Sequence, residues 1–387
     1  MKKQGIAFTQ WSNHLDHLAP ICELLDIPVI VDTPELAEIA AQFYPGLRVR
    51  LEHDPKSDAL IDYEVVFHAT RVPRSVPREV GFPRHMRFVH CPHGWSDKVW
   101  WNKWMALEDV TLIYGDAQLR LFEEYGTAPY LKSYVRAGNY RYRYYLEQRK
   151  RLDRLVAERV YARLDPHRAT ILYTPTWNDI DSSSSFFAAC APMIEQLPKH
   201  YQLIIKIHPL MDYQAQARVD QLIASCSNRH RVVCLKEFPL VFPLLSCAAI
   251  YIGDRSSVGY DYLAFRRPMF FLKTEDQRHV GVSRLDACGT AIHESQFGEL
   301  YDVIDRAMGV HAERFLPAQS EMWKTCFEPI VPGPELAAGI EAAVASERDD
   351  DSFEVPAELQ AEKQRQLVHL DLHTRERWLR LLPWRSR

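Results

Sequence analysis

Short apolar, β-rich runs alternate with helical patterns along most of this 387-residue chain, and this alternation restricts the fold more than any other feature. In the first half the pattern predicts strands at 5–9, 28–31, 64–68, 86–89 and 110–114. Predicted helices lie between them at 14–25, 34–43 and 116–125. Regular alternation of this kind is typical of parallel α/β architecture.

The alternation then starts again after a charged, strongly helical stretch at 142–164. Further strands are predicted at 169–173, 202–207, 231–235, 249–252 and 268–272. We therefore expect two Rossmann-like domains, at 1–150 and 169–346, joined by a helical connector at 151–168. The expected site is the cleft between them, since ligands of open parallel sheets bind beyond the carboxyl ends of the strands.

The amino-acid composition changes in the last segment, 347–387. It begins with an acidic, exposed linker and continues as a helix-prone tail that is basic and aromatic, with Trp378 and Trp384 among several arginines. Such a helix can lie in a membrane interface. The alternative is a C-terminal helix that packs back on the body of the protein, and the sequence does not choose between them.

Composition excludes several classes of protein. A net charge of −4 argues against a nucleic-acid partner, which would require a basic surface. The eight cysteines include no CxxC pair or Cys/His cluster, so we expect no metal site and a reducing compartment. The first residues do not resemble a signal peptide, and no run of 18 apolar residues occurs. These features predict a cytoplasmic protein, for which the basic tail offers one way to attach to the inner face of the membrane.

The first candidate for chemistry is the loop that follows the strand at 86–89. It contains His93 followed by Gly94, Trp95 and, three residues further on, Lys98. Glycine lets the backbone turn tightly and leaves room for a ligand. A histidine there has a pKa suited to accepting a proton from an attacking hydroxyl, so His93 is the candidate general base.

Two more clusters follow strands of the second half. Thr176 lies in the exit from the strand at 169–173, where it could hold a phosphate or serve as a local cap. His208 ends the apolar strand at 202–207, and Pro209 fixes its direction. We expect His208 to donate a hydrogen bond to the phosphates of a donor substrate.

The fourth cluster follows the strand at 249–252. Asp254 precedes the pair Ser256 and Ser257, which opens a short helix containing Asp261. Helix starts carry unpaired N–H groups and bind anions, and two serine hydroxyls add donors. The alternative is a plain N-cap, for which Ser and Asp are favoured in any case.

Together the four clusters resemble one known family. The ordered motifs are His93-Gly94 with Lys98, Pro175-Thr176, His208-Pro209, Asp254 with Ser256-Ser257 and Asp261-Tyr262, and Arg267-Pro268. This order and spacing resemble the CDP-glycerol glycerophosphotransferases, the teichoic-acid and capsule polymerases of bacteria, which have a GT-B fold. The chain lacks the motifs of P-loop nucleotidases, nicotinamide dehydrogenases, α/β-hydrolases and zincins.

The resemblance implies that an acceptor hydroxyl attacks the β-phosphorus of a CDP-alcohol and releases CMP. The acceptor would be a cell-surface glycan or a lipid-linked molecule, and the resemblance implies neither a cofactor nor a metal ion. By analogy His93 is the base, and His208, Ser256 and Ser257 hold the pyrophosphate. Thr176, Asp254 and Asp261 then belong to the donor site, and Gly94, Trp95 and Lys98 to the acceptor side.

Two other functions fit the same sequence. A GT-B glycosyltransferase would use the same helix start to hold the pyrophosphate of a nucleotide-sugar. A non-catalytic module could keep the fold and bind a surface polymer. The aromatic run Trp95, Trp100, Trp101 and Trp104 either stacks on a sugar-bearing acceptor, contacts a membrane interface or belongs to the core.

Overall fold

The computed structural model describes residues 5–52, 60, 62–69, 85–97, 108–178, 182, 184–226, 229–277 and 284–346. The chain divides into two compact units. Of the described residues, the first unit contains those up to 93, those from 108 to 143 and those from 326 to 346, and the second contains those from 94 to 97 and from 144 to 325. The predicted tail at 347–387 and Lys98 lie outside the described residues, as do Trp100, Trp101 and Trp104.

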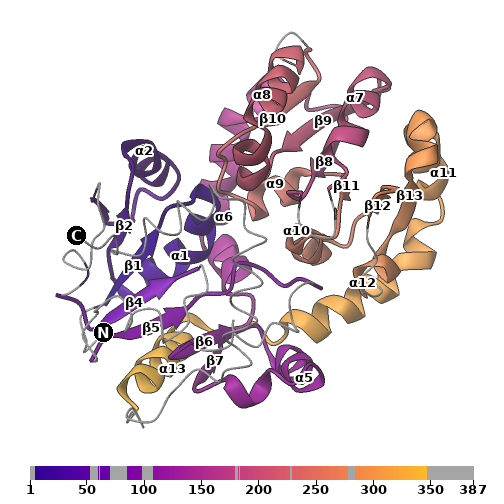
Figure 1. Ribbon diagram of the computed structural model, residues 1–387. Helices are drawn as coiled ribbons and strands as arrows, with labels where there is room; N and C mark the ends of the chain where they lie inside the picture. Colours follow the sequence, from indigo (N-terminus) through magenta and orange to yellow (C-terminus); the bar gives the residue numbers. More distant parts are fainter. Residues whose placement is uncertain are drawn as a thin grey trace. The chain divides into compact units, whose positions relative to one another are not determined.

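The first unit is built on a seven-stranded parallel sheet with the order β3-β2-β1-β4-β5-β6-β7 (Figure 1). Its strands are β1 (Gly5–Thr9), β2 (Val29–Val31), β3 (Val49–Leu51), β4 (Val65–His68), β5 (Arg87–His90), β6 (Val110–Ile113) and β7 (Tyr134–Arg136). Its helices include α1 (Ser12–Leu25), α2 (Pro34–Phe43), α5 (Asp116–Glu124) and the short η2 (Ala128–Tyr130). The strand order reverses between β1 and β4, the point where open α/β sheets bind their ligands.

The second unit is built on a six-stranded parallel sheet with the order β10-β9-β8-β11-β12-β13. Its strands are β8 (Ala169–Thr174), β9 (Tyr201–Lys206), β10 (Val232–Leu235), β11 (Ile250–Gly253), β12 (Met269–Lys273) and β13 (Thr290–His293). The strand order of this sheet reverses between β8 and β11. Two doubly wound parallel sheets confirm the fold class predicted from the alternating pattern.

Helices follow most strands of the second unit. They are α7 (Phe186–Glu195), α8 (Pro209–Cys226), α9 (Phe242–Cys247), α10 (Ser257–Tyr262), α11 (Leu300–Met308) and most of α12 (His311–Phe327). The short helices are η3 (Tyr161–Arg163), η4 (Leu263–Phe265), η5 (Arg284–Cys288) and η6 (Glu294–Glu299). The charged stretch at 142–164 forms the long helix α6 (Tyr140–Arg159) followed by η3, and the division between the units falls within its first turn.

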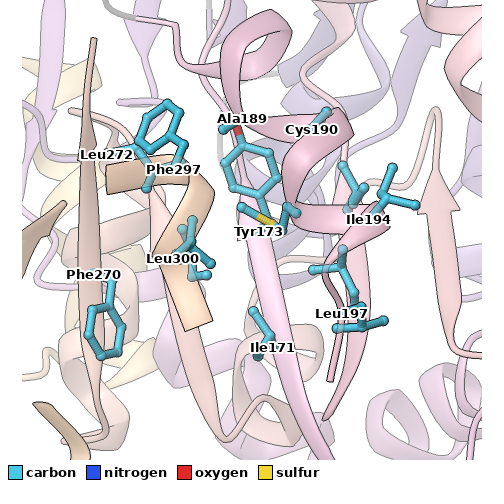
Figure 2. Close-up of a cluster of buried hydrophobic side chains, with 14 of the residues drawn as sticks. Ile171, Tyr173, Ala189, Cys190, Ile194, Leu197, Phe270, Leu272, Phe297 and Leu300 are labelled. Carbon is cyan, nitrogen blue, oxygen red and sulfur yellow. The ribbon is translucent and has the colours of Figure 1, made fainter. Parts of the chain in front are cut away.

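The core of the second unit follows from strand alternation. Ile171 and Tyr173 of β8 point to the same face of the sheet and belong to one buried cluster with Cys190 of α7 (Figure 2). Phe297 of η6 and Leu272 of β12 extend the same cluster. Side chains two residues apart on a strand share a face, so one strand supplies a row of apolar groups for the covering helices.

The last described helix, α13 (Gly333–Ala345), lies beside β7 (Figure 1). It also packs on α1 of the first unit. Its buried positions include Leu336, Ile340 and Val344, which recur every fourth residue and form one apolar face. The expected range 169–346 placed this segment with the second sheet, whereas its contacts place it with the first. Periodicity identifies the buried face of a helix but does not specify which sheet covers it.

Candidate active site

His93 lies beyond the carboxyl end of β5, in the first unit. Its Nδ1 atom lies 2.8 Å from the backbone oxygen of Ala69, which follows the neighbouring strand β4. A carbonyl oxygen only accepts hydrogen bonds, so Nδ1 carries the proton and donates it. In the neutral ring the lone pair is then on Nε2. The side chain is exposed, so His93 has the tautomer and the exposure that a general base requires.

Two further histidines lie close to His93, and the sequence analysis did not identify them as site residues. His14 and His17 of α1 have ring centroids 5.6 and 6.3 Å from that of His93. They are three residues apart and therefore share a helix face, directly after the first strand of the sheet. This spacing was the available signal. Burial, assisted by the positive charge of Arg141, lowers the pKa of His17 well below its usual value, so its ring is neutral at neutral pH.

Asp16 lies between these two histidines and anchors α1. Its carboxylate accepts a hydrogen bond from Arg141 Nε at 2.9 Å, a second one from Arg141 Nη2, and one from the Tyr44 hydroxyl at 3.3 Å. The Arg141 side chain is 2% exposed, so this is a buried ion pair whose charges are satisfied by good geometry. The pair fixes the helix that presents His14 and His17.

Residues 94–97, directly after His93, make most of their contacts with the second unit and are assigned to it. Gly94 has φ = +117°, a conformation that side chains disfavour, and a Cβ placed there would lie 2.4 Å from Ser257 Cβ. The structure therefore requires glycine at this turn, and the tight turn agrees with the prediction, while the space beside Gly94 is filled by Ser257. Asp97 accepts a hydrogen bond from the Tyr260 hydroxyl at 2.6 Å. Its backbone oxygen accepts one from Arg255 at 2.9 Å.

The sequence left Trp95 either stacked on an acceptor or placed in the core, and in the structure it lies in the core. Its indole is 1% exposed and packs against Tyr260, with the ring centroids 6.2 Å apart. A side chain with so little surface cannot stack on a substrate, so Trp95 is a core residue that holds its loop against α10. Local sequence could not show this because Tyr260 is far away in the chain.

Asp254 organises the loops at the switch point of the second sheet. It is fully buried, and its carboxylate accepts hydrogen bonds from the Thr176 N–H at 2.8 Å and the Ser185 N–H at 3.2 Å, and a third from the Ser185 hydroxyl. The sequence placed Asp254 in the donor site. In the structure its carboxylate connects the loop after β8 to the loop after β11.

The other donor-side candidates differ in exposure. Ser256 is the N-cap of the six-residue helix α10, because its hydroxyl accepts the Val258 N–H at 3.4 Å, and Ser257 is half-buried like Ser256. Asp261 is only 1% exposed. Thr176 is 5% exposed, and its backbone oxygen accepts the Ser184 hydroxyl at 2.8 Å. The two serines are thus the accessible hydroxyls of this cluster.

His208 follows β9, the strand next to β8. Its Nδ1 atom accepts the backbone N–H of Leu210 at 3.1 Å. In the neutral ring the proton is therefore on Nε2, which makes Nε2 a hydrogen-bond donor. His93 and His208 thus have opposite tautomers: one offers a lone pair at Nε2 and the other an N–H.

Within the described ranges no group of three or more His, Cys, Asp or Glu side chains is arranged to hold a metal ion. Over the same part of the chain no helix is both long and apolar enough to cross a bilayer.

Comparison with solved structures gives the same fold. The chain is similar to the wall teichoic acid polymerase TagF, with 12% identity, a TM-score of 0.58, and coverage of 95% of this chain and 90% of TagF. A histidine-to-asparagine variant of TagF soaked with CDPG matches with a TM-score of 0.59, at 11% identity over 88% of each chain. The UDP-GlcNAc 2-epimerase of Neisseria meningitidis, bound to UDP-GlcNAc, matches with a TM-score of 0.51 at 13% identity, over 88% of this chain and 99% of the epimerase.

At these identities the structural similarities establish the fold alone. No curated protein sequence matches this one. A family model matches residues 132–283, the segment that contains Thr176, His208, Ser256 and Ser257. The description of that family is CDP-glycerol:poly(glycerophosphate) glycerophosphotransferase. Residues 132–283 thus match the glycerophosphotransferase family, which confirms the resemblance that the motifs predicted, in a chain with a GT-B-like fold.

Proposed function

We propose that this protein transfers a glycerol-phosphate unit, or a related polyol-phosphate, from a CDP-alcohol to a hydroxyl of a cell-surface glycan or lipid-linked acceptor. The observation that carries the proposal is the opposite tautomers of His93 and His208, because the reaction needs one proton acceptor and one donor to phosphate oxygen. The family match over 132–283 supports the donor side. His93 precedes the matched segment, so its role rests on the motif and on the geometry at Ala69.

The proposed step is an in-line displacement at phosphorus. The acceptor oxygen forms a bond to the β-phosphorus while the bond from that phosphorus to the bridging oxygen breaks, and CMP leaves with the electron pair. The proton of the acceptor hydroxyl passes to Nε2 of His93. Nε2–H of His208 and the hydroxyls of Ser256 and Ser257 would stabilise the charge on the pyrophosphate oxygens. Ser256 can do this while it caps α10, because its hydroxyl hydrogen takes no part in the bond from Val258.

The buried residues take supporting roles in this proposal. Asp254 fixes the backbone of Thr176, so we assign Thr176 and Asp254 to shaping the donor site and Asp261 to the support of α10. Since both carboxylates are buried, the charge of the pyrophosphate would be balanced by histidine, hydroxyl and backbone donors. We therefore expect transfer to be independent of metal ions. Activity that is lost in EDTA and restored by Mg²⁺ would contradict this point.

A panel of donors tests the proposed reaction. Purified protein is incubated with CDP-glycerol, CDP-ribitol, and UDP-, GDP- and CMP-sugars, and release of nucleotide is followed. We expect CMP from a CDP-alcohol, lost by about 100-fold or more in His93→Ala and in His208→Ala. UDP or GDP release from a sugar donor, with none from CDP-alcohols, would instead identify a glycosyltransferase. Binding without turnover of any donor would identify a binding module.

Each histidine has a matched control on its own strand or sheet. His85 is exposed and precedes β5, so it lies at the amino end of the strand whose carboxyl end carries His93. His230 is exposed and precedes β10, next to β9. His85→Ala and His230→Ala should retain wild-type turnover. CMP release that survives His93→Ala and His208→Ala unchanged would refute the assigned roles.

We also propose a cytoplasmic site of action, with the basic tail at 347–387 as a peripheral attachment to the membrane. The support is its sequence of arginines and tryptophans. Co-sedimentation with anionic liposomes, compared between the full chain and a chain that ends at Ser346, tests this attachment. That truncation leaves α13 in place. Equal sedimentation of the two proteins would mean that the tail does not bind the membrane.

A further inference from the structure

The backbone carbonyl of Pro92, directly before His93, accepts hydrogen bonds from two buried tyrosines. The Tyr114 hydroxyl lies 3.3 Å from this oxygen and the Tyr140 hydroxyl lies 3.2 Å from it. The two tyrosines are 2% and 0% exposed. A carbonyl oxygen has two lone pairs, so it can accept both of these hydrogen bonds.

The partners of the Pro92–His93 segment come from the ends of successive strands. Ala69 follows β4, Pro92 and His93 follow β5, and Tyr114 follows β6. Tyr140 begins α6, after β7. The connections that follow β4, β6 and β7 thus each contribute one contact to the loop that carries His93. This convergence follows from the parallel order of β4 to β7.

These contacts constrain the histidine at two places. The carbonyl of Pro92 and the N–H of His93 belong to one planar peptide group, so fixing the oxygen fixes the plane from which His93 begins. The bond from Nδ1 to Ala69 then fixes the ring. With backbone and ring both held, Nε2 can point in only one direction.

The Tyr140 hydroxyl is suited to remain a donor. Burial raises the pKa of Tyr140 well above its ordinary value, and the nearby Cys91 and Tyr114 act in the same direction. A neutral phenol keeps its proton and continues to donate it to Pro92. Tyr114 is also held in place by its ring, which packs edge-on against Phe327 with centroids 5.3 Å apart.

We propose that Tyr114 and Tyr140 are positioning residues for the base: their hydroxyls clamp the Pro92–His93 peptide and set the direction of His93 Nε2. This inference rests on the proposed function in that His93 is the base of the transfer. The competing explanation is that the two bonds only satisfy a buried carbonyl.

The test removes one hydroxyl at a time without changing shape. Tyr114→Phe, Tyr140→Phe and the double variant are compared with Tyr262→Phe. Tyr262 is a matched control, since it is fully buried and its hydroxyl donates to the Ala248 carbonyl at 3.1 Å in the second unit. We expect kcat to fall about 10-fold in each single variant and about 100-fold in the double variant with KM unchanged, because small misplacements of a catalytic group cost up to about this much. A fall in kcat no larger than that of Tyr262→Phe at a comparable loss of Tm would overturn the proposal.

A second readout does not depend on transfer activity. In protein labelled with ¹⁵N at histidine, the signals of His93 are identified by their loss in His93→Asn, and they report which ring nitrogen carries the proton. We expect one tautomer, with the proton on Nδ1, in the wild type and in Tyr262→Phe, and a mixture in the double variant. A wild type without CMP release but with this tautomer shift would refute the proposed function and leave the clamp standing. An unchanged His93 spectrum in the double variant would refute the clamp itself.

Discussion

Nδ1 of His93 donates to the carbonyl oxygen of Ala69 across 2.8 Å, and this single contact decides which ring nitrogen can accept a proton. Asparagine can keep that contact, because its side-chain amide places a donor near the position of Nδ1, but it cannot act as a base. We expect His93→Asn to be folded and to lose about 10²- to 10⁴-fold in kcat. The measurement is CMP release together with thermal unfolding. His85→Asn serves as the control, and an active His93→Asn enzyme would exclude His93 as the base.

Protonation of His17 should destabilise the protein below about pH 6.5. Burial and Arg141 lower its folded pKa, whereas in the unfolded chain it titrates near its ordinary value. As the pH falls below that value, the unfolded state binds a proton that the folded state refuses, so the free energy of unfolding decreases by about 1.4 kcal/mol per pH unit. Urea unfolding of wild type and His17→Gln at pH 7.5, 6.5 and 5.5 measures this. The variant should lose less stability per pH unit, and equal losses in the two proteins would show that His17 does not resist protonation.

Asparagine at position 254 should destabilise the second unit. The Asp254 carboxylate now accepts hydrogen bonds from the Thr176 and Ser185 N–H groups and from the Ser185 hydroxyl. The NH₂ group of an asparagine side chain cannot accept a hydrogen bond, so it would face one of these donors with a donor of its own. We expect Asp254→Asn to cost about 1–3 kcal/mol in the free energy of unfolding, and more than Ser185→Ala. Urea denaturation measures the loss, with the exposed Asp276→Asn as the control. Additive effects of Asp254→Asn and Ser185→Ala would contradict the shared network.

The substitution Gly94→Ala should destabilise the protein for two reasons that can be tested separately. Its Cβ would collide with Ser257, and its φ of +117° would strain the backbone. We expect Gly94→Ala to cost about 1–3 kcal/mol in stability, whereas Gly298→Ala has open space around its Cβ and should cost less. Adding Ser257→Gly should recover the part due to the collision. If Ser257→Gly gives no recovery, the close approach of the two residues is not the cause.

Much of the fold was predictable because central strands carry apolar side chains on both faces. The strands at 5–9, 64–68 and 249–252 were located within one or two residues for this reason. The missed strands are β3, β7 and β13, which are edge strands of their sheets. Most of their side chains are exposed or half-buried. An edge strand is less covered than a central strand and needs no continuous run of apolar residues, so its sequence resembles that of a loop.

The site was predictable in its location and less so in its roles. His93, His208 and the Ser256-Ser257 pair follow strands, and the topology of a parallel sheet places such residues at its carboxyl edge. The burial of Asp254 and Trp95 depends on Ser185 and Tyr260, which lie far from them in the sequence. A local sequence pattern predicts which way a side chain points, but it does not predict how deeply residues from distant parts of the chain bury it. The cleft expected between the two domains stays a prediction.

The return of the chain to the first sheet at α13 has a consequence for synthesis on the ribosome. The strand β7 is complete at Arg136, but the helix that covers it begins only at Gly333, after the whole second unit has been made. About 200 residues separate the two, which at roughly 5–20 residues per second is a delay of about 10–40 s. During that interval the nascent first unit displays the apolar surface meant for Leu336, Ile340 and Val344. The growing chain therefore has a defined period in which chaperone binding would compete with premature aggregation.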